Sequence, residues 1–217
     1  MSAVTRTEVA DVKPVVEDAA AAPTTGKRKA DAPVSVDTFA QRRMMKELAG
    51  LRKVDQRATE QLVLEVIDEN DITRWRAKWY YDNADSPDAS NTQKRIAEQL
   101  RSRGLEFVEF RLIFPENYPE APPFVYNHYP RLIGPYVFGA GGLCLQTLNQ
   151  KHGWSCASRA QSLVVAVRAM LENAGCRLQN DDPKRHEAPF CESGARADNE
   201  AVARIHSSGW HGSAGRS

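Results

Sequence analysis

One cysteine, Cys144, lies between a glycine-rich run and a Gly-Trp pair in the stretch YVFGAGGLCLQTLNQKHGWSCA, residues 136–157. A cysteine thiolate is a strong nucleophile and can carry an acyl group as a thioester. Glycines at positions 139, 141 and 142 carry no side chains that would block a peptide tail on its way to the thiol. Cys144 is therefore the candidate nucleophile, and a small buried core residue is the alternative.

The composition argues against several other classes of function. Hydrophobic residues make up 41% and charged residues 26% of the 217 residues, which is typical of a soluble globular protein with one domain and appendages. The net charge of +1 predicts no general attraction to nucleic acid. The sequence shows neither a leader segment nor an apolar run of membrane-spanning length, so no membrane partner is expected.

The cysteines indicate the redox environment. Cys144, Cys156, Cys176 and Cys191 show no paired C-x-x-C spacing, which predicts reduced thiols in a cytoplasmic or nuclear protein. No metal site is expected, because Cys176, His186 and Cys191 match no zinc-ligand spacing.

The chain divides into three segments. Residues 1–36 contain no aromatic residue and no sustained apolar period, which predicts a disordered tail. The basic cluster GKRKA within this tail is a candidate nuclear-targeting signal. Residues 37–175 form the expected globular core, and residues 176–217 form a C-terminal extension.

The extension is predicted to be irregular over residues 176–196. Beyond that stretch, Val202 and Ile205 indicate a short helix over residues 199–206. Apolar residues of this kind have little reason to occur in a disordered tail, so we expect the helix to pack on the core.

Apolar spacing predicts a helix at each end of the core. Met44, Leu48 and Leu51 share one face of a helix whose candidate N-cap is Asp37. Near the other end, Ser158 and Gln161 have the spacing of a capping box. The apolar stripe of the helix that follows is Leu163, Val167, Met170 and Leu171, and Gly175 ends it.

Four segments between these helices are typical of strands, namely residues 62–68, 71–82, 105–114 and 124–127. In the second segment, Thr73, Trp75, Ala77, Trp79 and Tyr81 alternate with charged residues and share one face. A short helix with Ile96 and Leu100 is expected before the third segment, ended by Gly104. The element order predicts an α+β fold around a four-stranded antiparallel meander, with a cysteine-bearing loop before the C-terminal helices.

Four motifs occur in order over about residues 40–175: RRMMKEL, FRLIFPENYPEAPP, GLCLQTL and GWSCA. In this order and with these gaps, the chain resembles the catalytic core of the ubiquitin-conjugating enzymes. The insert before LEFVEF, the loop YVFGAGGLC and the tail ARIHSSGW make it most similar to the Q class of that family.

This resemblance implies that Cys144 accepts ubiquitin as a thioester from the activating enzyme and passes it to a substrate lysine or to a ligase. ATP is used by the activating enzyme, so no cofactor is expected on this chain. Two alternatives stay open. One is a non-catalytic relative that binds ubiquitin or a partner, and the other is a conjugating enzyme for another ubiquitin-like modifier.

One departure from the family pattern concerns the chemistry. Most family members have His-Pro-Asn where this chain has Gly134, Pro135 and Tyr136, so an amide donor to the oxyanion is missing. The Tyr136 hydroxyl and backbone N–H groups of the glycine loop are the candidate replacements. For Tyr136, packing of the ring within the loop is the alternative.

The resemblance also implies surfaces for partners. Arg42, Arg43 and Lys46 match the basic first-helix face that meets the activating enzyme, with a solvated helix face as the alternative. The positions of the two ligase-contact loops are Glu120, Trp154, Ser155, Cys156 and Ala157. An acidic residue at position 120, in place of an aromatic one, predicts weakened docking of ordinary RING ligases, so the type of ligase is left open.

Overall fold

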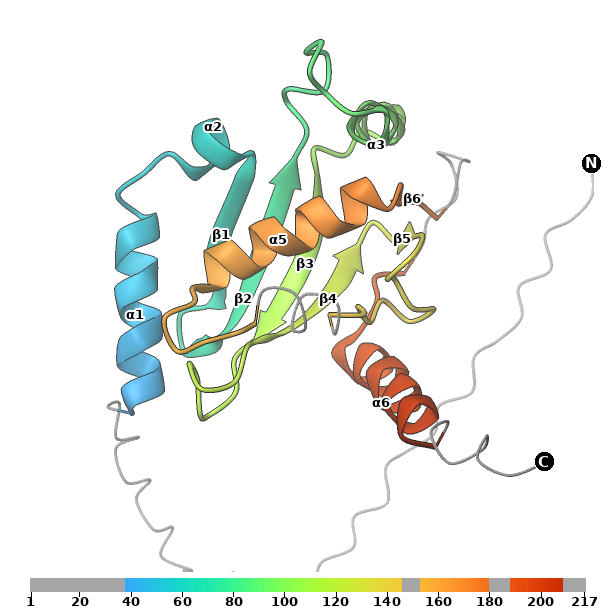
Figure 1. Ribbon diagram of the computed structural model, residues 1–217. Helices are drawn as coiled ribbons and strands as arrows, with labels where there is room; N and C mark the ends of the chain where they lie inside the picture. Colours follow the sequence, from blue (N-terminus) through green and yellow to red (C-terminus); the bar gives the residue numbers. More distant parts are fainter. Residues whose placement is uncertain (1–37, 146–152, 180–187, 209–217) are drawn as a thin grey trace, which may run out of the picture. The chain divides into compact units, whose positions relative to one another are not determined.

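The computed structural model describes residues 38–145, 153–179 and 188–208, with side chains through Arg204. The predicted disordered tail, Asp37 and the side chain of Ile205 lie outside the described residues. Within the described part, a four-stranded antiparallel sheet has one helix, α5, across one of its faces and other helices at its sides, and a second sheet has two short strands (Figure 1).

The sheet is the predicted meander. Its strands are β1 (Leu62–Asp68), β2 (Asp71–Tyr80), β3 (Phe107–Ile113) and β4 (Phe124–Tyr129), paired in that order and all antiparallel. The predicted alternation in β2 is confirmed at its centre, where Trp75, Ala77 and Trp79 are fully buried. Their neighbours Arg76 and Lys78 pair with Glu65 of β1 on the other face.

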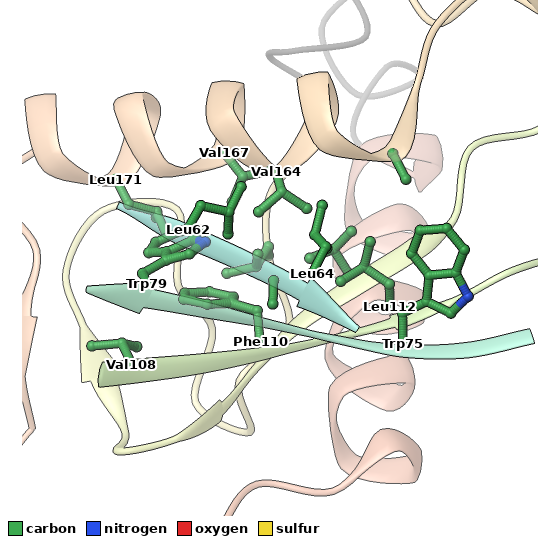
Figure 2. Close-up of a cluster of buried hydrophobic side chains, with 14 of the residues drawn as sticks. Leu62, Leu64, Trp75, Trp79, Val108, Phe110, Leu112, Val164, Val167 and Leu171 are labelled. Carbon is green, nitrogen blue, oxygen red and sulfur yellow. The ribbon is translucent and has the colours of Figure 1, made fainter. Parts of the chain in front are cut away.

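Helix α5 (Ala160–Asn173) covers the apolar face of the sheet (Figure 2). Trp79 and Phe110 stack there with their ring centroids 3.8 Å apart, beneath Val167 and Leu171. The predicted stripe on this helix is partly wrong: Ala160, Val164, Val167 and Leu171 are buried, whereas Leu163 and Met170 are only half-buried. Leu163 and Met170 still pack against the edge of the core.

Helix α1 (Phe39–Leu51) buries the predicted residues Met44, Leu48 and Leu51. Its N-cap is Thr38 rather than Asp37. The Thr38 hydroxyl accepts from the Gln41 N–H and the Gln41 side chain accepts from the Thr38 N–H, so the two form a reciprocal capping box.

The capping box predicted for α5 is absent. Arg159 occupies the N-cap position and makes no side-chain cap, while the Ser158 hydroxyl accepts from the N–H of Ser155 at 3.1 Å. The N–H of Ala160 donates instead to the Glu47 carboxylate of α1 at 3.0 Å. A charged acceptor from another helix thus replaces the local hydroxyl, since an anion at a helix N-terminus also stabilises the helix dipole.

Two shorter helices flank the sheet. Helix α3 (Asn91–Ser102) buries Ile96 and Leu100 as predicted and is followed by Gly104, whose φ of +66° suits a helix end. Helix α2 (Gln56–Glu60) was not predicted, because it is a single short turn capped by Asp55 and buries no residue.

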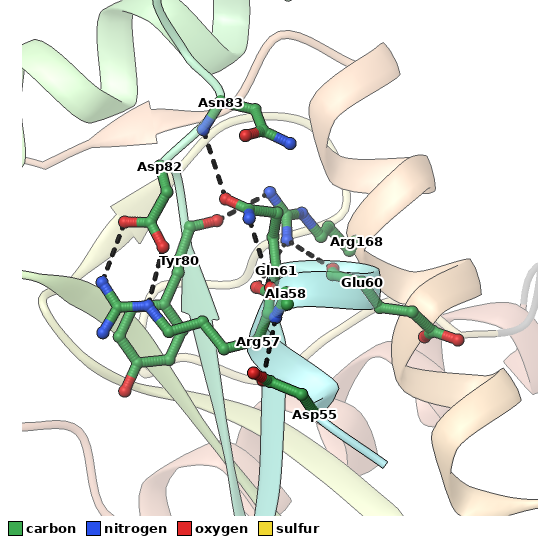
Figure 3. A network of polar contacts seen from close by, with 9 residues as sticks. All are labelled: Asp55, Arg57, Ala58, Glu60, Gln61, Tyr80, Asp82, Asn83 and Arg168. Carbon is green, nitrogen blue, oxygen red and sulfur yellow. Dashed lines mark hydrogen bonds and ion pairs between the residues drawn. The ribbon is translucent and has the colours of Figure 1, made fainter.

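A cluster of polar contacts joins the end of α2 and the end of β2 to Arg168 of α5 (Figure 3). Arg168 of α5 donates to the carbonyl oxygens of Gln61 and Tyr80, both at 2.9 Å, and of Glu60 at 3.4 Å. Its Nε is 2.8 Å from the Glu172 carboxylate. One cation therefore serves backbone acceptors from two segments that converge beneath α5.

The C-terminal extension is more ordered than the sequence predicts. Residues 176–196 are not irregular throughout: strand β6 (Arg177–Leu178) pairs antiparallel with β5 (Leu132–Ile133), and α6 (Glu192–Ser208) begins well before residue 199. Helix α6 was missed at its start because the segment ESGARADN carries small and charged residues in place of an apolar period.

Candidate active-site loop

The loop that carries Cys144 is a tight hairpin beside β4. Val137 forms a bridge with Leu143, and the N–H of Phe138 donates to the carbonyl of Gly142 at 2.8 Å. The N–H of Asn127 in β4 donates to the carbonyl of Gly141 at 3.0 Å. Sheet and hairpin bonds therefore fix the backbone just ahead of the cysteine.

The entry to this hairpin depends on Asn127, a completely buried polar residue. Its side chain accepts from the Leu132 N–H at 2.8 Å and donates to the Pro130 carbonyl at 3.1 Å. Buried amides need such partners, because an unpaired one would be costly. The sequence carries no signal for this role, since asparagine is more typical of exposed turns.

Cys144 is half-buried and lies outside the sheet core. Its N–H donates to the carbonyl of Tyr136 at 3.0 Å, and the preceding Leu143 is only 1% exposed. A buried anchor on one side and a backbone bond on the other hold the residue while part of its side chain stays accessible. That is the arrangement a nucleophile requires.

The other cysteines occupy different environments. Cys176 is buried, and that burial raises the pKa of its thiol to about 12, so it is a structural residue. Cys156 and Cys191 are both exposed. The hydroxyl of Ser193 and backbone N–H groups at the start of α6 lower the pKa of Cys191, which makes it the main competitor of Cys144 as a reactive thiol.

The glycines of the loop do not serve the purpose expected from the sequence. A Cβ on Gly141 would lie 2.6 Å from the Phe190 ring, and one on Gly142 would lie 2.6 Å from Oδ1 of Asn199. Both glycines are buried beneath the C-terminal extension. Gly139 alone among the three has open space around it, so only this position leaves room for an incoming chain.

Backbone N–H groups of the glycine loop were expected to help stabilise an oxyanion, and three of them are already engaged. Oδ2 of Asp198, from α6, accepts from the N–H of Ala140 at 2.7 Å and from that of Gly142 at 3.4 Å. The N–H of Gly141 donates to the carbonyl of Phe138 at 3.0 Å. Asp198 is a site residue that sequence reasoning missed.

Tyr136 is brought next to Cys144 through the backbone. Its φ is +70°, in the left-handed region that residues other than glycine rarely occupy, and 38% of its surface is exposed. Such a conformation persists only where neighbouring contacts hold it. The bond from the Cys144 N–H to the Tyr136 carbonyl is one of these contacts.

The two predicted ligase-contact loops lie together. The indole N–H of Trp154 donates to the Pro119 carbonyl at 2.7 Å, beside the exposed Glu120. The Trp154 ring also packs near Tyr118, with the ring centroids 5.9 Å apart. The remaining members of this surface, Ser155, Cys156 and Ala157, are all exposed.

Glu47 of α1 contacts that surface, and its side chain is only 7% exposed, although no local pattern in the sequence distinguishes it from the exposed acids. Its carboxylate accepts from the Tyr118 hydroxyl at 2.6 Å and pairs with Arg43 at 2.7 Å, besides capping α5. Burial, together with this carboxylate, raises the pKa of Tyr118. The hydroxyl is therefore held as a proton donor.

The three predicted basic residues of α1 differ in their surroundings. Arg43 is half-buried, pairs with Glu47 and donates to the Ser158 carbonyl at 2.9 Å. Arg42 and Lys46 are exposed. Arg43 therefore has an internal structural role, and the outward basic face consists of the other two.

Neither a metal site nor a membrane span occurs in the described part of the chain. Across residues 38–145, 153–179 and 188–208, no group of three or more potential ligand side chains is placed to hold a metal ion. His186 lies outside these residues. Over the same ranges, no helix combines the length and the apolar character that a membrane crossing requires.

Residues 104–195, which include Cys144, match the family model described as ubiquitin-conjugating enzyme. The chain is 27% identical over 179 residues to ubiquitin-conjugating enzyme E2 Q1 of Mus musculus, which covers 82% of this chain and 40% of that protein. It is 26% identical over 167 residues to ubiquitin-conjugating enzyme E2 Q-like protein 1 of Mus musculus, covering 76% of this chain and 95% of that protein.

The chain thus spans only two fifths of the length of E2 Q1. Among solved structures, human ubiquitin-conjugating enzyme E2 G1 matches with a TM-score of 0.45 and 24% identity, covering 59% of this chain and 90% of that chain.

Proposed function

Because this chain is related to the ubiquitin-conjugating enzymes, and among them to the Q class, we propose that it is a transferase that carries ubiquitin as a thioester on Cys144. The observation that carries the proposal is how the structure exposes and anchors Cys144. Cys144 is only half-buried, is anchored by its own N–H, and lies within the segment that matches the family.

In the loading step, the Cys144 thiolate attacks the carbonyl carbon of the thioester between ubiquitin and the activating enzyme. The new C–S bond forms as the old one breaks, and the activating enzyme's cysteine leaves as a thiolate. The exchange conserves the thioester, so it needs no further source of energy. ATP is used by the activating enzyme beforehand, and this chain binds no nucleotide for the reaction.

In the discharge step, a substrate lysine amine attacks the carbonyl carbon of the loaded thioester. The C–N bond forms, the nitrogen passes a proton to water, and the C–S bond breaks so that Cys144 leaves as a thiolate. Negative charge gathers on the carbonyl oxygen during the attack, and a nearby hydrogen-bond donor would stabilise it. Tyr136 is our candidate donor, since its carbonyl accepts from the Cys144 N–H and the residue is partly exposed.

Partner surfaces follow from the same proposal. Arg42 and Lys46 form the exposed basic face for the activating enzyme, next to a groove of about 590 Å³ that Lys46 and Lys53 help to line. Trp154 and Glu120 belong to the surface for a ligase of unknown type. Because Trp154 is held by the Pro119 carbonyl, that surface is preorganised, but the charge of Glu120 opposes an apolar partner.

The test is to incubate the chain with activating enzyme, ATP and ubiquitin and to look for an adduct that reductant releases. Cys144→Ser should remove the reductant-sensitive adduct or replace it with a reductant-resistant oxyester. Cys156→Ser and Cys191→Ser are matched controls, because they make the same change at exposed thiols. Both controls should load like the wild type.

Other outcomes identify the alternatives. Loss of the adduct in Cys191→Ser, with Cys144→Ser unchanged, would assign the reaction to the wrong thiol. Binding of ubiquitin without any adduct would indicate a non-catalytic relative. An adduct formed only with another modifier and its own activating enzyme would keep the chemistry and change the substrate.

A further inference from the structure

The C-terminal helix α6 reaches the cysteine loop through one carboxylate. Oδ2 of Asp198 accepts from the N–H of Ala140 at 2.7 Å and from the N–H of Gly142 at 3.4 Å. The hairpin's own hydrogen bonds use the N–H groups of Phe138 and Gly141 instead. Asp198 therefore supplies acceptors that the loop lacks, and hydrogen bonds to a charged acceptor are stronger than neutral ones.

The contact between helix and loop is as close as glycine permits. A Cβ on Gly142 would lie 2.6 Å from Oδ1 of Asn199 and 2.8 Å from the Ala195 carbonyl. On the helix side, a Cβ on Gly194 would lie 3.2 Å from the Cβ of Ala140. Backbone thus lies against backbone, and Asp198 has little freedom to move relative to the loop.

Helix α6 is in turn fixed to the sheet. Glu192 pairs with Arg74 of β2 at 2.7 Å, and the Arg196 guanidinium lies 4.4 Å from the centre of the Phe124 ring of β4. Before the helix, the N–H of Phe190 donates to the carbonyl of His128 at 2.9 Å. These contacts make α6 a fixed support for the carboxylate that it carries.

The support is close in sequence to the thiol. Gly142, which Asp198 holds, is followed by buried Leu143 and then by Cys144. We propose that Asp198 is a positioning residue, which sets the orientation of Cys144 by clamping the two N–H groups of the turn before it. This inference rests on the proposed function, and Asp198 lies beyond the segment that matches the family model.

The expected defect is in the chemical step. Without the clamp the turn relaxes and the thiol shifts, and a displacement of about 1 Å costs on the order of 10- to 100-fold in rate. The proposed docking face for the activating enzyme is on α1 rather than on this loop, so the KM for that enzyme should not change. A falling kcat at constant KM separates misplacement from weaker binding.

Four full-length variants test the proposal, with rates expressed per folded molecule. Asp198→Ala removes the acceptor, Asp198→Asn keeps a neutral acceptor, and Asp198→Glu keeps the charge but moves it by one methylene. Glu200→Ala is the matched control, because it removes the same charge from an exposed position on the same helix.

We expect Asp198→Ala to lower kcat of thioester formation by about 10- to 100-fold, with Asp198→Glu also impaired. Asp198→Asn should stay within about threefold of the wild type, since a neutral oxygen still accepts both bonds. Glu200→Ala should load normally. Should Asp198→Ala fail to fold, the proposal is tested by whether kcat is higher in Asp198→Asn than in Asp198→Glu.

Amide exchange provides a readout that a general loss of stability would not reproduce. The amides of Ala140 and Gly142 should exchange about tenfold faster in Asp198→Ala than in Glu200→Ala, with the amides of β2 unchanged. If the wild type forms the thioester and the Asp198 variants form it at the same rate, this inference alone is overturned. Absence of any thioester in the wild type would overturn the proposed function and the inference together.

Discussion

Two side chains of opposite charge hold backbone in two regions of the molecule. Arg168 of α5 donates to the carbonyl oxygens of Glu60, Gln61 and Tyr80 (Figure 3), and Asp198 of α6 accepts from two N–H groups of the cysteine loop. The first joins α2 and the end of β2 to α5. The second fixes the loop that leads to the half-buried Cys144.

Similar local chemistry serves different ends in the two regions. Loss of the Arg168 clamp removes the cation that bridges these carbonyl oxygens and the Glu172 carboxylate from a side chain only 13% exposed, so it should cost stability. Loss of the Asp198 clamp leaves N–H groups at the surface, where water can reach them. It should therefore cost positional accuracy more than stability.

The largest effect is expected from Arg168→Met. Removing this guanidinium should lower the free energy of unfolding by about 3 kcal/mol, because part-buried carbonyl oxygens and the Glu172 carboxylate lose a charged donor. For a domain of this size, that corresponds to a melting temperature lower by about 10 °C in calorimetry. Arg101→Met is the control, since Arg101 pairs with Asp85 in solvent and 57% of its side chain is exposed. Equal shifts in both variants would contradict the buried role.

A smaller effect is expected from Gly142→Ala. The added methyl group has no room against α6, and overpacking of this kind costs about 1–3 kcal/mol. Thermal unfolding and the loading rate should both suffer, because the helix must move away from the loop. Gly139→Ala is the matched control for thermal unfolding, since nothing lies within 4 Å of its Cβ position. A larger loss of thermal stability in Gly139→Ala than in Gly142→Ala would contradict the importance of the contact between Gly142 and α6.

Tyr136→Phe should affect chemistry without affecting the fold. If the hydroxyl stabilises the oxyanion, discharge of ubiquitin to free lysine should slow by about 10- to 100-fold, at or below the loss typical of one strong donor. Loading and melting temperature should change little. Tyr136→Ala tests the alternative, in which the ring serves only to pack the loop. In that case the Tyr136→Phe variant would discharge ubiquitin normally, and the Tyr136→Ala variant would have a less stable loop.

The smallest effect is a pH dependence at His128, which holds Phe190 through its ring Nδ1 and the Phe190 carbonyl at 2.9 Å. Burial lowers the pKa of His128, and the cation Arg111 lowers it further, despite opposing effects of the Phe190 carbonyl and Glu109. The unfolded chain then binds more protons just below its ordinary pKa near 6.5, so stability falls as the solution is acidified through that range.

Melting temperatures measured on either side of that pKa check this sign. The wild type should lose more stability on acidification than His128→Gln, which keeps a donor but cannot titrate. An equal loss in both proteins would show that His128 does not contribute.

The sheet and the helices on its face were predictable because their pattern is local. Trp75, Ala77 and Trp79 alternate with charged residues, and Met44, Leu48 and Leu51 follow a helical period. These features are visible in short windows of the sequence and agree with the burial observed. Cys144 was a candidate for the same reason, since its neighbours are close in sequence.

The supports of the site could not be predicted, because each joins distant segments. Glu47 caps α5 in place of Ser158, which had the correct local spacing. Asp198 appears as one more charge in a polar stretch, since α6 meets the loop through Gly194 and Ala195 rather than through large apolar residues. Small residues leave no hydrophobic period, so neither the start of α6 nor its role showed in the sequence.

The close approach at Gly142 also limits how this protein can evolve. Any side chain at position 142 would collide with the amide of residue 199 and the backbone carbonyl of residue 195, so a lineage that gains one must displace the helix. Positions in the loop and in α6 should therefore vary together among descendants of this sequence. In close relatives, residues at these positions should change together, even where neither residue is itself kept.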